Sequence, residues 1–362
     1  MKRKRPKVAV GMSGGVDSSV SAYLLKQQGY DVIGITMLIY DDSAGIQEYG
    51  RHACYGPGEK EDLLSAASLC RDLGIPFHSF DLKEEYRREV LDYVREEYLA
   101  GRTPNPCVVC NRQVKFGFLT QKAKEAGLDF DFFATGHYAR IEREGGRFLL
   151  KRAVDRAKDQ SYFLYGMKPN QLGMTLFPLG GHTKEEARRI ARSIGLKAAD
   201  RPESQDFVAG GEYATLFSRD DLKGGDIVDV SGNVVGRHRG IIHYTVGQRR
   251  GLGVAAGRPL YVVKIDAVRN RLVVGDRDRL FSRGLIAGDL NLIALDRIEE
   301  PLSAQVKIRL QHRPAKARIF PQGHHRAKVL FDEPQMTVTP GQSAVFYSGD
   351  VVLGGGVIEK AL

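Results

Sequence analysis

The chain has 362 residues, of which 42% are hydrophobic and 27% charged, and a formal net charge of +10 at pH 7. This length predicts two or three domains, and the lack of any apolar run long enough to cross a bilayer argues against a membrane protein. The positive charge favours a polyanionic partner. No secretory apolar segment follows the basic start of the chain, so we expect a cytoplasmic location.

Strand-like and helix-like segments alternate along roughly the first 200 residues. We expect strands over residues 8–12, 31–39, 76–80 and 130–135, and helices over residues 17–28, 60–73, 84–100, 113–126 and 183–194. Such alternation predicts an α/β fold with a doubly wound parallel sheet, in which ligands bind beyond the carboxyl ends of the strands.

The second half of the chain has a different character. Short β-branched runs between Gly-rich turns predict two small mainly-β domains, the last of them a β-barrel. We place the domain boundaries so that the domains span residues 1–205, 206–288 and 289–362. Between residues 305 and 328 there are seven Lys or Arg, three His and no acidic residue, which favours contact with a nucleic acid backbone.

A Gly-rich turn joins the first predicted strand to the first predicted helix, with the sequence Ser13-Gly14-Gly15-Val16-Asp17-Ser18. A strand–loop–helix of this kind aims backbone N–H groups at one point and forms a nest that binds phosphate. No lysine follows the glycines as in a P-loop, and the spacing is not that of a dinucleotide fingerprint. The loop instead resembles the PP-loop of ATP pyrophosphatases, which adenylate a substrate oxygen and release pyrophosphate.

The chain has four cysteines, and two of them form the pair Cys107-Val108-Val109-Cys110 on a Pro-containing segment that we expect to be a loop between two helices. Such a pair can be half of a zinc site, a redox pair, part of an iron–sulfur site, or two buried structural thiols. The absence of a second such pair excludes a zinc ribbon built from two of them. Cys70, flanked by leucines in a predicted helix, is expected in the core.

Motifs along nearly the whole chain together resemble the MnmA family of tRNA-specific 2-thiouridylases. They are the segments at residues 11–19, 101–106, 110–111, 115–116, 135–138, 158–164, 247–252 and 340–347. The resemblance implies an adenine nucleotide alpha hydrolase-like catalytic domain. It also implies a reaction in which ATP adenylates the C2 oxygen of the wobble uridine in the anticodon loop of tRNA, and sulfur then replaces that oxygen. The implied partners are tRNA and a sulfur donor protein or sulfide, not DNA or a membrane.

The resemblance also assigns roles to residues of this chain. It implies ATP binding, with Mg²⁺, by Gly11, Met12, Ser13, Gly14, Gly15, Val16, Asp17, Ser18, Met37 and Gly136. It implies tRNA contacts by Asn105, Pro106, Cys107, His137, Lys158, Asp159, Gln160, Arg309, Leu310 and Gln342. Cys110 stands at the position of the catalytic nucleophile.

Two positions depart from the family pattern. Cys107 stands where the family loop has an aspartate, and Val208 stands where the family has its second catalytic cysteine. Valine cannot carry a persulfide or form a disulfide. We therefore expect Cys54, Cys107 and Cys110 to ligate a [4Fe–4S] cluster that delivers the sulfur. The alternative is a persulfide on Cys110, with Cys107 or an external thiol as the resolving group.

Two functions of other classes share some of these features. A PP-loop amide or amine ligase would have the same first loop, but it would not need the cysteine pair or the basic β-domains. A non-enzymatic RNA-binding protein with a zinc half-site would release no pyrophosphate from ATP and tRNA.

Overall fold

The computed structural model describes residues 5–42, 46, 53–196, 206–208 and 213–362. The chain divides into two compact units. The first comprises Met1–Val90, Cys107–Glu212 and Asp350–Val352, and the second comprises Leu91–Pro106, Tyr213–Gly349 and Leu353–Leu362. No helix among the described residues is long and apolar enough to cross a membrane.

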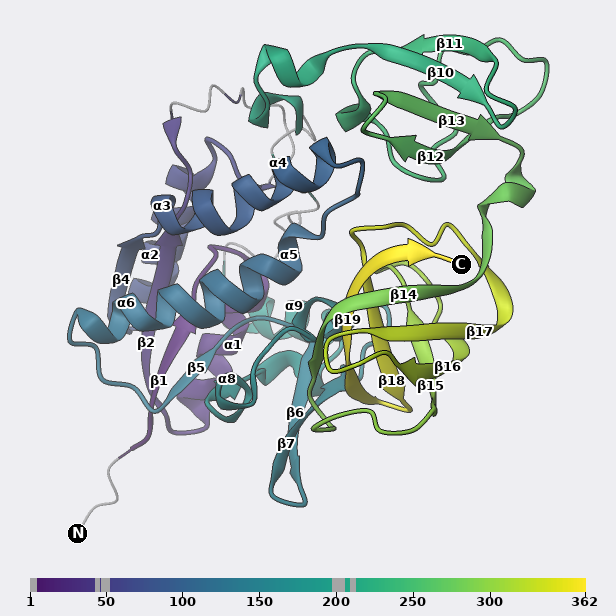
Figure 1. Cartoon of the computed structure of the whole chain (residues 1–362). Helices are drawn as coiled ribbons and strands as arrows, with labels where there is room; N and C mark the ends of the chain where they lie inside the picture. The colour runs from purple at the N-terminus through teal and green to yellow at the C-terminus, as the bar shows by residue number, and fades with distance from the viewer. Residues whose placement is uncertain (1–4, 43–45, 47–52, 197–205, 209–212) are drawn as a thin grey trace. The chain divides into compact units, whose positions relative to one another are not determined.

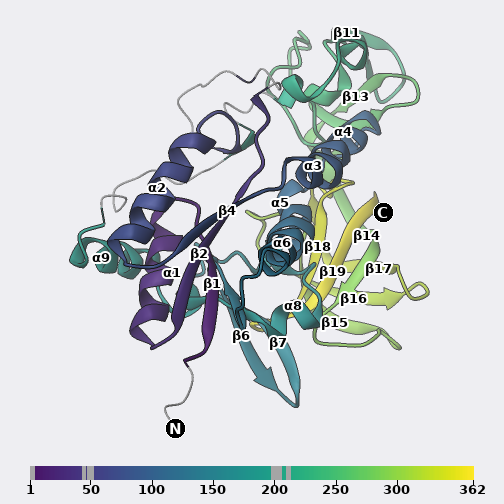
Figure 2. The same cartoon turned by 90° about the vertical axis from the view of Figure 1, so that its left-hand side faces the viewer.

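A five-stranded sheet forms the centre of the first unit, with all neighbouring strands parallel. In spatial order its strands are β4 (Phe77–Asp81), β2 (Asp31–Leu38), β1 (Lys7–Gly11), β5 (Phe132–Ala134) and β8 (Thr175–Leu176). Figure 2 shows α1, α2 and α9 on one face of this sheet and α6 on the other. Starting from β1, the chain adds β2 and β4 on one side of the sheet and then β5 and β8 on the other. The doubly wound parallel sheet predicted from the sequence is therefore confirmed.

The predicted helical segments are confirmed, but three short helices at residues 106–109, 161–164 and 169–173 were not predicted. The helices of the first unit are α1 (Val16–Gln27), α2 (Glu59–Asp72), α3 (Lys83–Tyr86), α5 (Pro106–Val109), α6 (Leu119–Glu125), α7 (Ser161–Leu164), α8 (Pro169–Gly173) and α9 (Lys184–Ser193). Two π-helical segments, Arg87–Leu91 and Cys110–Phe118, lie within the long predicted helices. The first of these continues into α4 (Asp92–Leu99), which belongs to the second unit.

An antiparallel hairpin of β6 (Ala139–Glu144) and β7 (Arg147–Arg152) also lies in the first unit. Its charged residues obscure the alternation that marks a strand, so the hairpin is not predicted from the sequence. The short strands β3 (Ala53–Tyr55) and β9 (Asp206–Val208) pair in parallel and were also missed.

The second unit is mainly β-structure, as predicted. A four-stranded sheet has the order β11 (Val234–His238), β10 (Gly225–Asp229), β13 (Arg271–Gly275) and β12 (Tyr261–Asp266). Six further strands form a barrel, closed by pairing of β14 with β19 (Figure 1). In order these strands are β14 (Phe281–Leu292), β17 (Ala327–Met336), β16 (Ala315–Pro321), β15 (Leu302–Lys307), β18 (Ser343–Ser348) and β19 (Val351–Ala361). The expected barrel is therefore confirmed, whereas the domain boundaries stay a prediction.

Close packing in the core of the first unit assigns Cys70 a structural role. Its side chain is fully buried in α2, and burial raises the pKa of its thiol to about 12. A Cβ atom at Gly34 of β2 would lie 2.5 Å from the Cys70 Sγ atom. The glycine therefore makes room for the sulfur, which agrees with the core position expected for this cysteine.

This contact predicts that the cost of Gly34→Ala depends on the residue at position 70. In the native chain the added methyl group meets the sulfur, and overpacking of this kind costs about 1–3 kcal/mol. In a Cys70→Ala background the sulfur is gone and the cost should fall. Hydrogen exchange of the β1 and β2 amides measures local stability in all four proteins. Equal costs in the two backgrounds would contradict this packing.

Candidate active site

The loop between β1 and α1 is held by serine hydroxyls. Ser18 Oγ lies 3.3 Å from the backbone nitrogen of Ser13, which donates to it, and 3.1 Å from the Gly15 carbonyl oxygen, which accepts from it. Gly14 has a φ of 72°, a left-handed conformation that favours glycine. The chain thus turns tightly into α1, whose first N–H groups have no partner within the helix.

The carboxyl end of β5 comes into close contact with the first turn of α1. A Cβ atom at Gly136 would lie 2.7 Å from the Asp17 carbonyl carbon and 2.8 Å from the Ser18 nitrogen, so only glycine fits. Two residues later, the Tyr138 hydroxyl donates to Asp17 Oδ1 at 2.9 Å. These contacts fix the start of α1 against β5.

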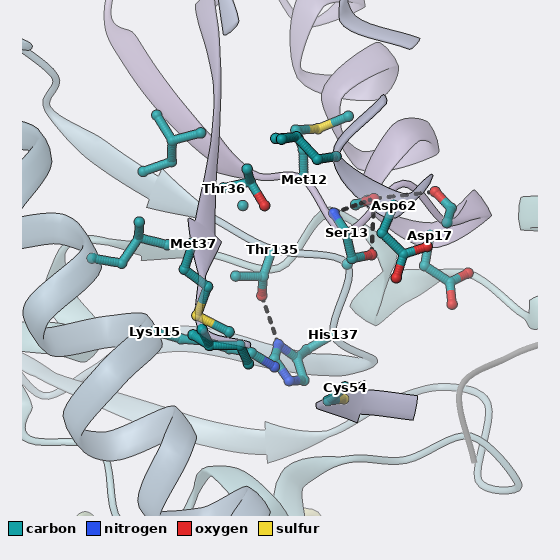
Figure 3. Close-up of a pocket in the computed structure, with 18 of the residues that line it drawn as sticks. Met12, Ser13, Asp17, Thr36, Met37, Cys54, Asp62, Lys115, Thr135 and His137 are labelled. Carbon is teal, nitrogen blue, oxygen red and sulfur yellow. Dashed lines mark hydrogen bonds between the residues drawn. The ribbon is translucent and has the colours of Figure 1, made fainter. Parts of the chain in front are cut away.

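A cavity of about 360 Å³ opens at this edge of the sheet (Figure 3). All the predicted ATP-binding residues line it except Gly14, whose carbonyl accepts a hydrogen bond from Ser65. The cavity is also lined by Cys54, Lys115, His137 and Lys184. Its size is that of a typical small-molecule site, and its position beyond the parallel strands is where such folds bind ligands. The individual ATP-binding roles stay predictions.

His137 lies on the wall of this cavity as an uncharged imidazole. Its Nδ1 atom is 2.7 Å from Thr135 Oγ1, and its ring packs beside those of Phe116 and Phe177. Burial and the nearby Lys115 ammonium lower the pKa of His137 to about 3. Figure 3 shows the Lys115 and His137 side chains close together, with Cys54 nearby.

Three thiols gather beside the cavity, and two of them are poorly ionised. Burial raises the pKa of Cys107 to about 12 and that of Cys110 to about 11, while the nearby Lys115 ammonium opposes both increases. Cys110 is buried, Cys107 is partly exposed, and Cys54 is exposed on β3. A thiolate is the reactive form of cysteine, so the pair needs a cation to become nucleophilic.

Lys115 is the described cation that interacts with these thiols. Burial by itself lowers the pKa of Lys115, but Cys110, Cys54 and Cys107 together raise it above its ordinary value. Cys110 and Lys115 both belong to the π-helical segment Cys110–Phe118, in which residues five apart lie on adjacent turns. This segment therefore explains how an ammonium on the wall of the cavity comes near a buried sulfur.

The prediction that Cys107 and Cys110 lie on a loop is wrong. Helix α5 begins at Pro106, and Cys110 opens the π-helical segment that continues it. A proline at the first helical position lacks only an N–H that the helix does not use, and its fixed φ suits the helix. Pro106 therefore begins a helix here instead of forming part of a loop.

The three cysteines do not form a metal site in this structure. Among the residues that the structure describes, no group of three or more His, Cys, Asp or Glu side chains is arranged to hold a metal ion. Val208 is fully buried and pairs with Tyr55 across β9 and β3. Because side chains alternate along a strand, Cys54 points to the opposite face from Tyr55. Ser204 and Gln205, which precede this segment, lie outside the described residues.

Some residues predicted to contact tRNA have structural hydrogen bonds in the first unit. Asp159 is buried, and its carboxylate accepts from the Ala153 and Ser161 backbone nitrogens at 3.1 and 3.2 Å. Gln160 lines the cavity, and its Oε1 atom accepts from the Tyr138 nitrogen at 2.9 Å. Lys158 lies in the turn before them. Their contacts with tRNA stay predictions.

In the second unit, the barrel holds the segment before α5. The Gln342 amide donates to the Thr103 and Pro104 carbonyl oxygens at 3.2 and 2.9 Å. Asn105 Nδ2 lies 3.4 Å from Ser343 Oγ. The structure thus brings Gln342 beside Asn105 and Pro106, whereas Arg309 and Leu310 follow β15 in a turn. The roles of all five toward tRNA stay predictions.

The cavity also contains charged residues that sequence reasoning did not single out. Lys115 was noted only as part of a motif, and Lys184 and Asp62 were not considered. Lys115 follows Cys110 by five residues, a spacing that brings two residues together in a π-helix but not in the α-helix expected here. No local signal marks Lys184, which is 167 residues from its ion-pair partner Asp17.

A parallel sheet with a Ser-Gly-Gly-x-Asp-Ser loop and a cavity at its carboxyl edge defines a nucleotide-using protein of the PP-loop class. Family models agree with this assignment. They match residues 6–209 as "tRNA methyl transferase HUP domain", residues 218–276 as "tRNA methyl transferase PRC-barrel domain" and residues 282–358 as "Aminomethyltransferase beta-barrel domain".

Similar proteins match over nearly the full chain. The tRNA-specific 2-thiouridylase MnmA of Clostridioides difficile is 45% identical, over 98% of this chain and 99% of its own length. The protein of the same name from Acetivibrio thermocellus is 46% identical, over 98% of this chain and 99% of its own length. That of Carboxydothermus hydrogenoformans is also 46% identical, over 99% of this chain and 99% of its own length. The chain belongs to the MnmA family of tRNA-specific 2-thiouridylases.

The contact at Gly136 yields a prediction about nucleotide binding. Gly136→Ala should displace the first turn of α1 and weaken ATP binding at least tenfold, because the added Cβ has no room. Gly181→Ala is the matched control, since nothing lies within 4 Å of a Cβ atom there. Calorimetric titration with ATP measures both variants. Native affinity in the Gly136 variant would mean that the loop tolerates the shift.

The neutral His137 predicts a loss of stability in acid. Its pKa is about 3 in the folded protein and near 6.5 when unfolded, so its contribution is complete above pH 6.5 and falls as the pH drops toward 3. Between pH 7 and 5.5 the native chain should lose about 1 kcal/mol more than His137→Gln, which cannot be protonated. Urea unfolding at the two pH values measures this difference, and equal losses would contradict a neutral ring in the folded protein.

Proposed function

We propose that this chain is a tRNA-uridine 2-sulfurtransferase that uses ATP. The uridine O2 atom attacks the α-phosphorus of ATP, and the bond to the β-phosphate oxygen breaks, releasing pyrophosphate. The adenylated oxygen is now a good leaving group. Sulfur attacks C2, and AMP departs with the original oxygen, leaving 2-thiouridine.

One observation carries this proposal. The cavity lined by the PP-loop is also lined by Cys54 and Lys115, and Lys115 interacts with Cys107 and Cys110. A phosphate-binding loop and a group of thiols thus adjoin the same small-molecule site. Adenylation and sulfur attack must occur at the same uridine ring, so they require this proximity.

The arrangement of the thiols supports the persulfide route. In this route the Cys110 thiolate attacks the outer sulfur of a persulfide on a donor protein, and the donor cysteine leaves as a thiolate. The terminal sulfur of the new Cys110 persulfide then attacks C2. The Cys107 thiolate then attacks Cys110 Sγ and breaks the sulfur–sulfur bond. The product is a Cys107–Cys110 disulfide, which an external thiol must reduce. Lys115 lies near both sulfurs, and its ammonium opposes the increase in their pKa that burial causes.

A [4Fe–4S] cluster on Cys54, Cys107 and Cys110 is the other form of the proposal. It accounts for two differences from the family pattern, namely a cysteine instead of an aspartate at Cys107 and a valine instead of a cysteine at Val208. The described residues present no ready set of metal ligands, so we derive no step through such a cluster. It stays a prediction that iron analysis can decide.

The remaining partners follow from the charges of the two units. Mg²⁺ would accompany the phosphates, and the carboxylates of Asp17 and Asp62 line the cavity. The basic residues Lys307 and Arg309, with Lys316 and Arg318 on β16, supply cations for tRNA phosphates. A wobble uridine lies in a single-stranded loop, from which a base can be splayed into a pocket. A cytoplasmic location goes with this substrate.

Serine substitutions of the cysteines test the sulfur route. Under the persulfide route, Cys110→Ser abolishes 2-thiouridine formation. Without an external thiol, the native protein loaded with persulfide completes a single turnover, whereas Cys107→Ser stays joined to the uridine through a sulfur–sulfur bond and releases no product. Cys54→Ser retains activity, and Cys70→Ser serves as a control in the core. Thiouridine in tRNA is quantified by mass spectrometry after incubation with ATP and a sulfur source.

The same set of proteins, purified without oxygen, tests the cluster. Iron and sulfide bound at about four atoms each, together with loss of both iron and activity in Cys54→Ser, would overturn the persulfide route. A colourless native protein that is fully active with a persulfide donor would exclude the cluster. Pyrophosphate release that depends on an amine instead of tRNA would indicate a ligase.

A further inference from the structure

Lys184 is a second cation on the wall of the cavity. It is the first residue of α9, and only 7% of its surface is accessible to solvent. Together with the PP-loop it lines the cavity. Its Nζ atom lies 2.9 and 2.8 Å from the two carboxylate oxygens of Asp17. No role was assigned to this lysine by the sequence motifs.

The position of Lys184 is fixed from several sides. Its backbone nitrogen donates to Asp155 Oδ2 at 3.0 Å, and Thr183 caps α9 through a hydrogen bond from the Glu186 nitrogen. Its ammonium lies 5.9 Å from the centre of the Tyr138 ring, whose hydroxyl also binds Asp17. The ammonium is therefore held at the start of α1 by elements that are distant in sequence.

The charge balance of the cavity requires such a cation. Asp17, Glu59 and Asp62 line it with negative charge, and among the described residues the lysines that line it are Lys115 and Lys184. Lys115 interacts with the thiols. Lys184 alone of the two is paired with a residue of the PP-loop, which is where a nest of N–H groups would hold phosphate.

The PP-loop also lacks the lysine that a P-loop uses. In a P-loop, a lysine directly after the glycines reaches the β- and γ-phosphates. We propose that Lys184 takes this part from outside the loop, binding the β- and γ-phosphates of ATP and the pyrophosphate that leaves, and that Asp17 is the residue that positions its ammonium. This inference rests on the proposed use of ATP by the chain, but not on the sulfur chemistry.

The proposal predicts that removing the Lys184 charge weakens the binding of ligands with a pyrophosphate group but not the binding of AMP. Lys184→Met keeps the apolar stem and removes the charge. The affinity for inorganic pyrophosphate and for ATP should fall about tenfold to a hundredfold, as expected for loss of a charge-assisted contact. The affinity for AMP should stay within about twofold of the native value. Calorimetric titration with each of the three ligands measures these affinities.

Lys122→Met is the matched control. Lys122 is also ion-paired, at 2.7 Å to Glu85, but it does not line the cavity. It should bind all three ligands as the native protein does. Equal weakening of AMP and ATP in Lys184→Met, or no weakening of pyrophosphate, would overturn the proposal, because a purely structural lysine would not discriminate between these ligands.

Lys184→Met leaves the Asp17 carboxylate without its ion-pair partner and so can destabilise the fold. A second comparison avoids this problem. In an Asp17→Asn background the carboxylate charge is gone, so the effect of Lys184→Met can be measured without an unpaired buried charge. Weaker pyrophosphate binding in the double variant than in Asp17→Asn supports the proposal, and equal binding refutes it.

The outcomes also separate this assignment from the proposed function. If native protein binds pyrophosphate through Lys184 but makes no thiouridine, the proposed function fails while this assignment stands. If native protein binds neither ATP nor pyrophosphate, both fail.

Discussion

The backbone at Gly136 lies so close to the first turn of α1 that no side chain fits between them. This contact joins the end of β5 to the PP-loop, and the adjacent side chains depend on it. Tyr138 reaches Asp17 from the same segment, and Lys184 reaches Asp17 from α9. Separation at this point would break the hydrogen bond between Tyr138 and Asp17 and free the first turn of α1 to move.

A second constraint is the burial of the thiols. In the proposed persulfide route, burial of Cys110 would protect the persulfide from water, yet burial also raises the pKa of Cys110 and suppresses its thiolate. Lys115 offsets part of this increase, because its ammonium is close to the sulfurs, and it also lines the candidate ATP cavity. The neighbouring His137 stays neutral and so adds no second charge to compete with it.

The strength of local sequence signals explains which predictions succeeded. Long periodic segments predicted α1, α2 and α9 nearly to the residue, and short apolar runs predicted β1, β2, β4 and β5. The two-residue strand β8 was not predicted. The segment at Cys107 and Cys110 was misjudged because a proline can either end one helix or begin the next. The β6–β7 hairpin was missed because its residues are mostly charged or only partly buried.

The sequence by itself determined the fold class, the phosphate-binding loop, the thiol pair and the family, because each of these is written in contiguous residues with strong local preferences. Only the tertiary structure decided that Lys115 lies near the thiols, that Lys184 pairs with Asp17, and that Gln342 holds the segment before Cys107. These pairings join residues far apart in the chain or on a π-helical turn. Their partners depend on how the strands and helices pack, which no local pattern encodes.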